Sequence, residues 1–101
     1  MATAKTLMAP AAKAPTYATV KPLLQKNTCL ACHNQNTRQV GPAYIDVAKR
    51  KYSIEQIIQL IHNPKPEHWP DYATPMPPMP QVPKEEARQI AQWIKSLEKA
   101  K

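Results

Sequence analysis

Aromatic residues are scarce in this chain of 101 residues, which has no Phe, two Trp and four Tyr. Aromatic side chains supply much of the volume of most hydrophobic cores. A chain of this length forms one small domain, and a domain of that size buries only a modest share of its unfolded surface. We therefore expect a large, flat, apolar cofactor to fill part of the core.

Long apolar runs are also missing. No stretch approaches the ~20 residues needed to cross a bilayer. The first 18 residues lack the apolar middle part of a signal peptide. If the protein is exported, we expect its export signal or membrane anchor to lie upstream of residue 1.

Acidic residues are few as well, with 7 Asp and Glu against 14 Lys and Arg, which gives a formal net charge of +7. The excess is strongest in the first 22 residues, which contain three lysines and no acid. A basic chain favours an anionic partner surface. Because no nucleic-acid-binding motif accompanies the charge, we expect a solvated basic surface and no nucleic-acid partner.

No segment shows the alternation of a β-strand, whereas apolar residues recur at helical spacing in several places. The expected architecture is therefore all-α. We expect helices over residues 20–27 with Thr19 as N-cap, over residues 43–50, from Ser53 to the Asn63–Pro64 stop, and for about four turns from Lys84. Ser53 and Gln56 have the spacing of a capping box.

Proline marks the irregular parts. Eight of the 12 prolines fall between Pro64 and Pro83. Because each removes a backbone N–H, this stretch is predicted to be a loop. Residues 1–18 are rich in Ala, Lys, Thr and Pro and have no hydrophobic period, so we expect a flexible tail or linker there. Residues 19–101 are expected to form one monomeric domain.

The strongest motif is Cys29-Leu30-Ala31-Cys32-His33. In this C-x-x-C-H spacing two thiols can form thioethers with the vinyl groups of a haem, and the adjacent His can bind the iron as proximal ligand. A redox-active dithiol normally follows a strand of a βαβ unit, and no such unit is expected here. A zinc site needs four ligands, and only two distant histidines could join Cys29, Cys32 and His33. A plain disulfide leaves His33 unexplained. The sequence therefore predicts one haem c bound through Cys29 and Cys32.

A haem iron has a sixth position, and the proline-rich stretch offers two methionines for it, Met76 and Met79. A thioether is a soft ligand that raises the reduction potential of the iron. The prolines around both residues stiffen the loop and lower the entropy cost of holding one sulfur in place. These arguments do not distinguish Met76 from Met79.

Three segments give the chain its resemblance to the class I cytochromes c, in particular the short bacterial monohaem members. They are the haem motif at 29–33, Val-Gly-Pro-Ala-Tyr-Ile-Asp-Val-Ala at 40–48, and Pro-Met-Pro-Pro at 75–78. The resemblance covers about residues 20–98. It implies a small cytochrome c fold of about four helices wrapped around one covalently bound haem.

The resemblance also implies roles for single residues. The carbonyl of Pro42 would accept a hydrogen bond from His33, and His33 and Met76, rather than Met79, would be the axial ligands of the iron. Trp93 would pack near the haem and the first helix. Trp69 is expected to pack against the haem edge.

The chain departs from the family pattern in several positions. Thr28 stands where relatives often have Gly, and Met79 where they often have a polar residue. Leu60 replaces a basic residue that helps to neutralise a haem propionate in short relatives. The substitute for that charge stays open among four residues, His62, Lys65, His68 and Trp69. Taken alone, His62 and His68 are expected to be ordinary polar surface residues.

With both axial positions filled by protein, electron transfer is favoured over catalysis or gas binding. We therefore expect an electron carrier, not an enzyme, in a bacterial respiratory or related redox chain. Its expected partners are redox proteins with acidic docking surfaces. The expected location is the periplasm, or the periplasmic side of a membrane with an N-terminal tether. The alternatives are the electron-accepting haem domain of a larger membrane-bound redox enzyme or oxidase and, further off, a haem enzyme or gas sensor.

Overall fold

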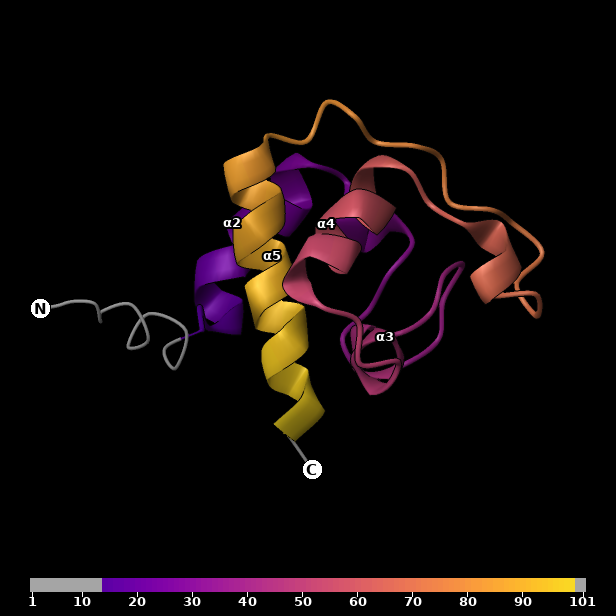
Figure 1. Cartoon of the computed structure of the whole chain (residues 1–101), viewed down its shortest axis with the longest axis horizontal. Helices are drawn as coiled ribbons and strands as arrows, with labels where there is room; N and C mark the ends of the chain where they lie inside the picture. The colour runs from indigo at the N-terminus through magenta and orange to yellow at the C-terminus, as the bar shows by residue number, and fades with distance from the viewer. Residues whose placement is uncertain (1–13, 100–101) are drawn as a thin grey trace, which may run out of the picture.

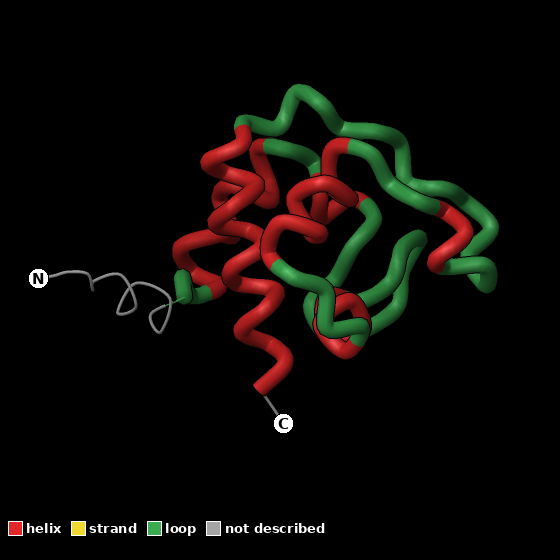
Figure 2. The backbone as a smooth tube through the Cα atoms, in the orientation of Figure 1, coloured by secondary structure: helices red, strands yellow, loops and turns green. Residues whose placement is uncertain are grey.

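A computed structural model describes residues 14–99, so residues 1–13 of the expected tail lie outside the described part. Four α-helices follow one another, α2 (Tyr17–Lys26), α3 (Tyr44–Lys49), α4 (Ile54–His62) and α5 (Lys84–Ser96). Three short 3-10 helices accompany them, η1 (Cys29–Ala31), η2 (Pro66–His68) and η3 (Leu97–Lys99). Residues 14–99 contain no strand (Figure 2). The expected all-α architecture is confirmed.

Helix α2 begins earlier than the sequence suggested. Thr16 is its N-cap, and the Thr16 side chain accepts a hydrogen bond from the backbone N–H of Thr19 at 3.3 Å. The ring of Tyr17 packs on Trp93, with 5.3 Å between the ring centroids. The expected cap at Thr19 is therefore wrong, and residues 17 and 18 belong to the folded domain. Pro22 lies inside the helix at an exposed position, where water can solvate the carbonyl that it leaves unpaired.

Helix α5 is the centre of the core and packs against α2, α3 and α4 (Figure 1). Its buried face consists of Ala87, Ile90, Ala91, Trp93 and Ile94. These positions recur at helical spacing, as the sequence predicts. The other helices contribute buried residues that include Leu24, Tyr44 and Ile58. The core therefore lies along one side of α5.

Helix α4 starts as expected. The Ser53 hydroxyl accepts from the N–H of Gln56 at 3.1 Å, and the Gln56 side chain accepts from the N–H of Ser53 at 2.8 Å. This capping box satisfies two N–H groups that the first turn would leave unpaired. The helix ends at His62, before Asn63 and Pro64.

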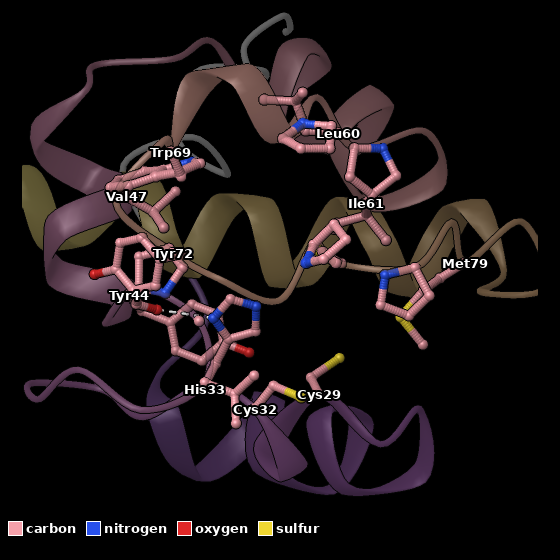
Figure 3. A pocket seen from close by; sticks show the side chains of 18 of the residues that line it. Cys29, Cys32, His33, Tyr44, Val47, Leu60, Ile61, Trp69, Tyr72 and Met79 are labelled. Carbon is pink, nitrogen blue, oxygen red and sulfur yellow. Dashed lines mark hydrogen bonds between the residues drawn. The ribbon is translucent and has the colours of Figure 1, made fainter.

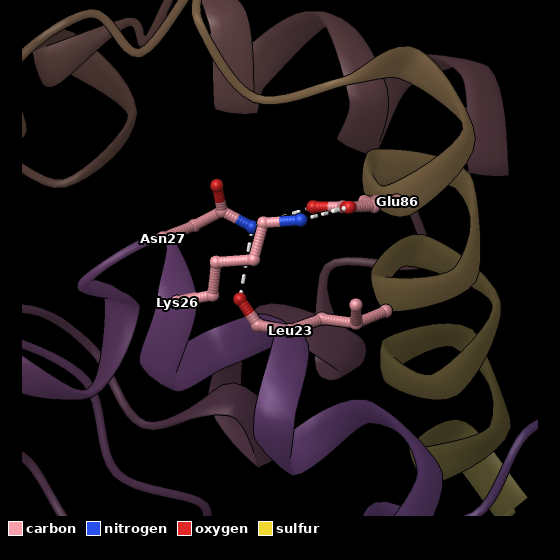
Figure 4. A network of polar contacts seen from close by, with 4 residues as sticks. All are labelled: Leu23, Lys26, Asn27 and Glu86. Carbon is pink, nitrogen blue, oxygen red and sulfur yellow. Dashed lines mark hydrogen bonds and ion pairs between the residues drawn. The ribbon is translucent and has the colours of Figure 1, made fainter.

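A polar junction joins the end of α2 to the start of α5 (Figure 4). Glu86 accepts from Lys26 Nζ at 2.6 Å and from Asn27 Nδ2 at 3.0 Å. The same Asn27 amide donates to the carbonyl of Leu23 at 2.9 Å. These hydrogen bonds, chiefly the one from Lys26, lower the pKa of Glu86. The junction fixes the direction in which the chain leaves α2 and enters the Cys29–His33 motif.

The proline-rich stretch after α4 forms a long irregular segment that contains η2 and returns to α5 (Figure 1). Near its end Val82 is buried in the core, and the Val82 carbonyl accepts from His62 Nε2 at 2.9 Å. His62 is half-buried. The expectation of an ordinary surface histidine is therefore wrong for His62, because its ring fastens the end of this segment to α4.

Candidate functional site

A cavity of about 290 Å³ lies between the Cys29–His33 motif, α4, α5 and the proline-rich segment (Figure 3). Its volume is near the lower end of the range for small-molecule sites. Most of its lining is apolar, with Val47, Ile57, Leu60, Ile61, Ile90 and Ile94 among the contributing residues. The cavity can therefore enclose an apolar group and keep water away from it.

Both cysteines of the motif line this cavity and both are free thiols. Burial raises the pKa of the Cys29 thiol. A redox-active dithiol has a lowered thiol pKa instead, so the environment of Cys29 does not favour that alternative. No group of three or more potential metal-ligating His, Cys, Asp or Glu side chains occurs in the part of the chain that the structure describes, so a zinc site is not supported either.

Thr28, directly before the motif, adopts the left-handed conformation with φ 62° and ψ 20°. Glycine adopts this conformation without strain, whereas a residue with a Cβ does not. The backbone conformation at position 28 would therefore suit Gly better than Thr. In this chain the Thr28 hydroxyl donates to the carbonyl of Asn27 at 2.6 Å.

The ring of His33 is oriented by its neighbours. Its Nδ1 lies 2.8 Å from the carbonyl oxygen of Pro42. Because a carbonyl only accepts, Nδ1 carries the proton and the lone pair remains on Nε2. The ring also stacks on Tyr44 at 5.0 Å between centroids.

The loop from the motif to α3 holds this arrangement together. The N–H of Gly41 donates to the carbonyl of Cys32 at 2.8 Å, and the N–H of Tyr44 donates to the carbonyl of Asn34 at 2.9 Å. Burial lowers the pKa of His33 and outweighs the Pro42 hydrogen bond, which raises it. His33 therefore presents a neutral imidazole, the form that binds a metal.

The facing wall comes from the proline-rich segment. Met76 and Met79 both line the cavity and are both half-buried, and Met79 also packs on the hydrophobic core. Figure 3 shows Met79 on the side of the cavity where Cys29 lies. The structure thus brings both candidate sulfurs to the cavity that His33 faces.

Trp69 lines the cavity as expected, whereas Trp93 does not. Trp93 is only 3% exposed and packs between Tyr17 and Tyr44. Its expected packing on the first helix is present, but it reaches the cavity only through Tyr44. Direct contact between Trp93 and a cofactor is therefore not supported.

His68 also lines the cavity, so the expectation of an ordinary surface residue is wrong for it too. Its Nδ1 lies 2.8 Å from the hydroxyl of Tyr52, and the two rings stack at 5.8 Å. Tyr52 and Tyr72, for which the sequence predicts no role, line the cavity as well. No periodic pattern marks these tyrosines, because both belong to irregular segments.

The chemistry of these residues fits a haem. Two free thiols and a neutral imidazole with an available Nε2 line the same apolar cavity. Two methionine sulfurs, the other type of haem ligand that the sequence offers, line it too. One flat apolar cofactor can therefore be bound covalently at Cys29 and Cys32 and ligated by His33.

Known proteins share both the sequence and the fold. The family model described as Cytochrome c matches residues 17–98. Cytochrome c-552 of Hydrogenobacter thermophilus is 39% identical over 79 residues, which is 74% of this chain and 78% of that protein. Cytochrome c-551 of Stutzerimonas stutzeri is 37% identical over 79 residues, 74% of this chain and 73% of that protein.

A solved structure gives the same result. The crystal structure of wild-type Nitrosomonas europaea cytochrome c552 superposes with a TM-score of 0.69 at 32% identity, covering 76% of this chain and 98% of that chain. Cys29 and Cys32 accordingly bind one haem c, and the protein is a small electron carrier and not an enzyme. The chain belongs to the cytochrome c family.

Proposed function

We propose that this protein passes single electrons in a bacterial respiratory or related redox chain, with His33 and Met76 as the axial ligands of the haem iron. One observation carries the proposal. His33, Met76 and both thiols line a single apolar cavity. Two occupied axial positions leave no open site for oxygen or peroxide, which favours electron transfer over catalysis.

Haem supplies an iron that changes between the ferric and ferrous states by one electron. Pro42 fixes the ring orientation of His33 through Nδ1 and leaves Nε2 for the iron. The soft sulfur of Met76 favours the ferrous state. The apolar lining excludes water, and this strengthens electrostatic interactions within the cavity.

Met76 is preferred to Met79 because it stands in the Pro75–Pro78 match to the family pattern. The test compares two alanine variants of the haem-bearing protein. Met76→Ala should abolish the weak near-infrared sulfur-to-ferric absorption band and lower the reduction potential, while Met79→Ala should keep the band. The reverse result would transfer the ligand role to Met79.

Carbon monoxide separates a carrier from a gas sensor. With both axial positions occupied, the ferrous protein should not bind carbon monoxide readily at neutral pH. The Met76→Ala variant, with one position opened, should bind it. Ready binding by the unmodified protein would favour the sensor alternative.

Periplasmic location and acidic partners belong to the same proposal. In the family, haem is attached outside the cytoplasm, which supports the periplasm or a periplasm-facing location. Lys65 is exposed and lines the cavity, so it supports a partner whose docking surface is acidic. Electron exchange with the partner should then slow as salt is added, because screening acts over ~10 Å at 0.1 M.

No helix within residues 14–99 has the length and apolar character to cross a membrane. A role as a tether for residues 1–15, which precede the Thr16 cap of α2, is supported by their composition, since they carry lysines and no acid. A tether would raise the local concentration of the haem domain at its partner. It would suit either a membrane-anchored carrier or an electron-accepting domain of a larger redox enzyme.

A further inference from the structure

Two arginines cover the outer faces of two rings in the cavity wall. Arg50 Cζ lies 3.7 Å from the centroid of the Trp69 ring, and Arg38 Cζ lies 3.9 Å from the centroid of the Tyr72 ring. Trp69 and Tyr72 line the cavity and meet edge to face at 5.9 Å. Neither arginine lines the cavity. The arginines therefore act on its contents through the two rings.

The arginines and the rings come from different parts of the chain. Arg50 is the C-cap of α3, and Arg38 lies in the loop between the Cys29–His33 motif and α3. The rings lie just after η2. Every backbone–backbone hydrogen bond of residues 64–82 in the described part stays within that stretch. Arg38 supplies a tie to the rest of the molecule, because its guanidinium donates to the carbonyl of Asp71 at 2.7 Å.

Neither guanidinium is neutralised by a carboxylate. The four ion pairs found within residues 14–99 involve other cations, Lys26, Lys49, Arg88 and Lys95. The acids nearest in sequence to the rings, Glu67 and Asp71, form no ion pair in that range. Lys65, on the same segment, lines the cavity and is equally without one. Arg38, Arg50 and Lys65 thus bring three cations to this end of the cavity against the two carboxylates of Glu67 and Asp71, an excess of one positive charge.

The covalent structure of haem determines which of its edges reaches this end. Its vinyl groups, which bond to Cys29 and Cys32, lie on the opposite half of the porphyrin from its two propionate carboxylates. Figure 3 shows Trp69 and Tyr72 across the cavity from Cys29 and Met79. A haem bound through Cys29 and Cys32 would then carry its carboxylates toward the rings that the arginines cover. Leu60, on α4, is apolar and adds no charge there.

We propose that Arg38 and Arg50 are positioning residues for the propionate edge of the haem. They hold Tyr72 and Trp69 in place, so that the phenol and the indole could each supply a hydrogen-bond donor to the carboxylates. Their charges also compensate the carboxylates and favour the ferrous state, because reduction adds a negative charge. The electrostatic role of a basic residue on α4 thus passes to two arginines on other elements.

The test uses the haem-bearing protein and two readouts, the equilibrium constant for reduction by a mediator and amide exchange over residues 66–72. Arg38→Gln and Arg50→Gln should each lower that constant by roughly two- to tenfold, as expected for one charge at ~10 Å in a medium of intermediate dielectric. Both should speed amide exchange over residues 66–72. Lys21→Gln on α2 removes the same charge far from the rings and should change neither readout appreciably.

One lysine variant separates the effect of charge from that of ring positioning. Arg50→Lys keeps the charge but loses the planar face that stacks on Trp69. Its equilibrium constant for reduction should stay close to that of the unmodified protein. Amide exchange over residues 66–72 should still become faster. If Arg50→Gln does not accept haem, the amide exchange of Arg50→Lys tests the positioning role by itself. Unchanged exchange over residues 66–72 in that variant would then contradict the proposal. Unchanged potentials in the glutamine variants, or a shift matched by Lys21→Gln, would overturn the proposal.

Discussion

Gly41 packs so closely on His33 that a Cβ at position 41 would lie 2.7 Å from Cε1 of the imidazole and 3.1 Å from Nδ1. Real side chains do not approach so closely, so the ring or the loop would have to move. The missing side chain of Gly41 is thus a condition for the hydrogen bond between His33 and Pro42. Gly41 directly precedes Pro42, so its contact with the His33 ring lies beside the hydrogen bond from His33 Nδ1 to the Pro42 carbonyl.

Gly41→Ala should therefore disturb the proximal side of the haem. We expect a loss of about 1–3 kcal/mol in the free energy of unfolding, the usual effect of overpacking, and a shifted haem spectrum. Gln39→Ala is the matched control, since Gln39 is exposed, lies in the same loop and does not line the cavity. It should change stability by less than about 0.5 kcal/mol. Equal effects of the two variants in denaturant titrations would show that the close contact is unimportant.

Thr28→Gly should stabilise the protein, because Thr28 has φ 62°. Relief of the left-handed strain is worth about 1 kcal/mol, reduced by loss of the hydroxyl bond to Asn27. Lys51, with φ 58°, offers the same test without such a bond. Lys49→Gly within α3 should instead destabilise by about 1 kcal/mol. Thermal unfolding of the three variants checks this ordering, which fails if Lys51→Gly and Lys49→Gly behave alike.

Glu86 should contribute to acid sensitivity. Its pKa is lowered in the folded state, so its contribution to stability is present above the unfolded pKa of about 4.3 and is lost as the pH falls through the lower, folded value. Glu86→Gln should reduce stability at pH 7 and flatten the acid limb of the stability curve. Glu85→Gln, in the same turn but exposed, is the control. A steep acid limb retained in Glu86→Gln would refute the assignment.

Two truncations define where the tether ends. Deleting residues 1–13 should leave the haem spectrum and melting temperature nearly unchanged. Deleting residues 1–18 also removes the Thr16 cap and the Tyr17 contact with Trp93, each worth about 1 kcal/mol. The longer deletion should therefore lower the melting temperature measurably. A large effect of the shorter one would mean that the first 13 residues pack on the domain.

Local sequence patterns predicted much of this fold because their causes are local. The capping box at Ser53 and the apolar face of α5 depend only on spacing along one helix. The haem motif is local too, since five consecutive residues carry both thiols and the imidazole. The start of α2 was misplaced because Pro22 was assigned to the first turn, whereas the contact between Tyr17 and Trp93 extends the helix.

The rest of the site depends on residues far apart in the sequence. Asn27 meets Glu86 from 59 positions away, and Arg38 meets Asp71 from 33. No spacing rule connects such pairs, so the arginines and the tyrosines of the cavity wall went unrecognised. Met76 and Met79 share one proline cluster and one cavity, and only the family pattern separates them.

The way in which the proline-rich segment is fastened has a consequence for opening of the native protein. Helices α4 and α5 pack directly on each other, so the segment that joins them is not needed to keep them together. Side chains tie it down at His62–Val82, Tyr52–His68 and Arg38–Asp71. Because these ties are few, we expect the part of the segment that precedes the buried Val82 to open as a unit while the helices remain folded. With the proposed ligation by Met76, such opening would release this ligand before His33, which is anchored in the motif between α2 and α3.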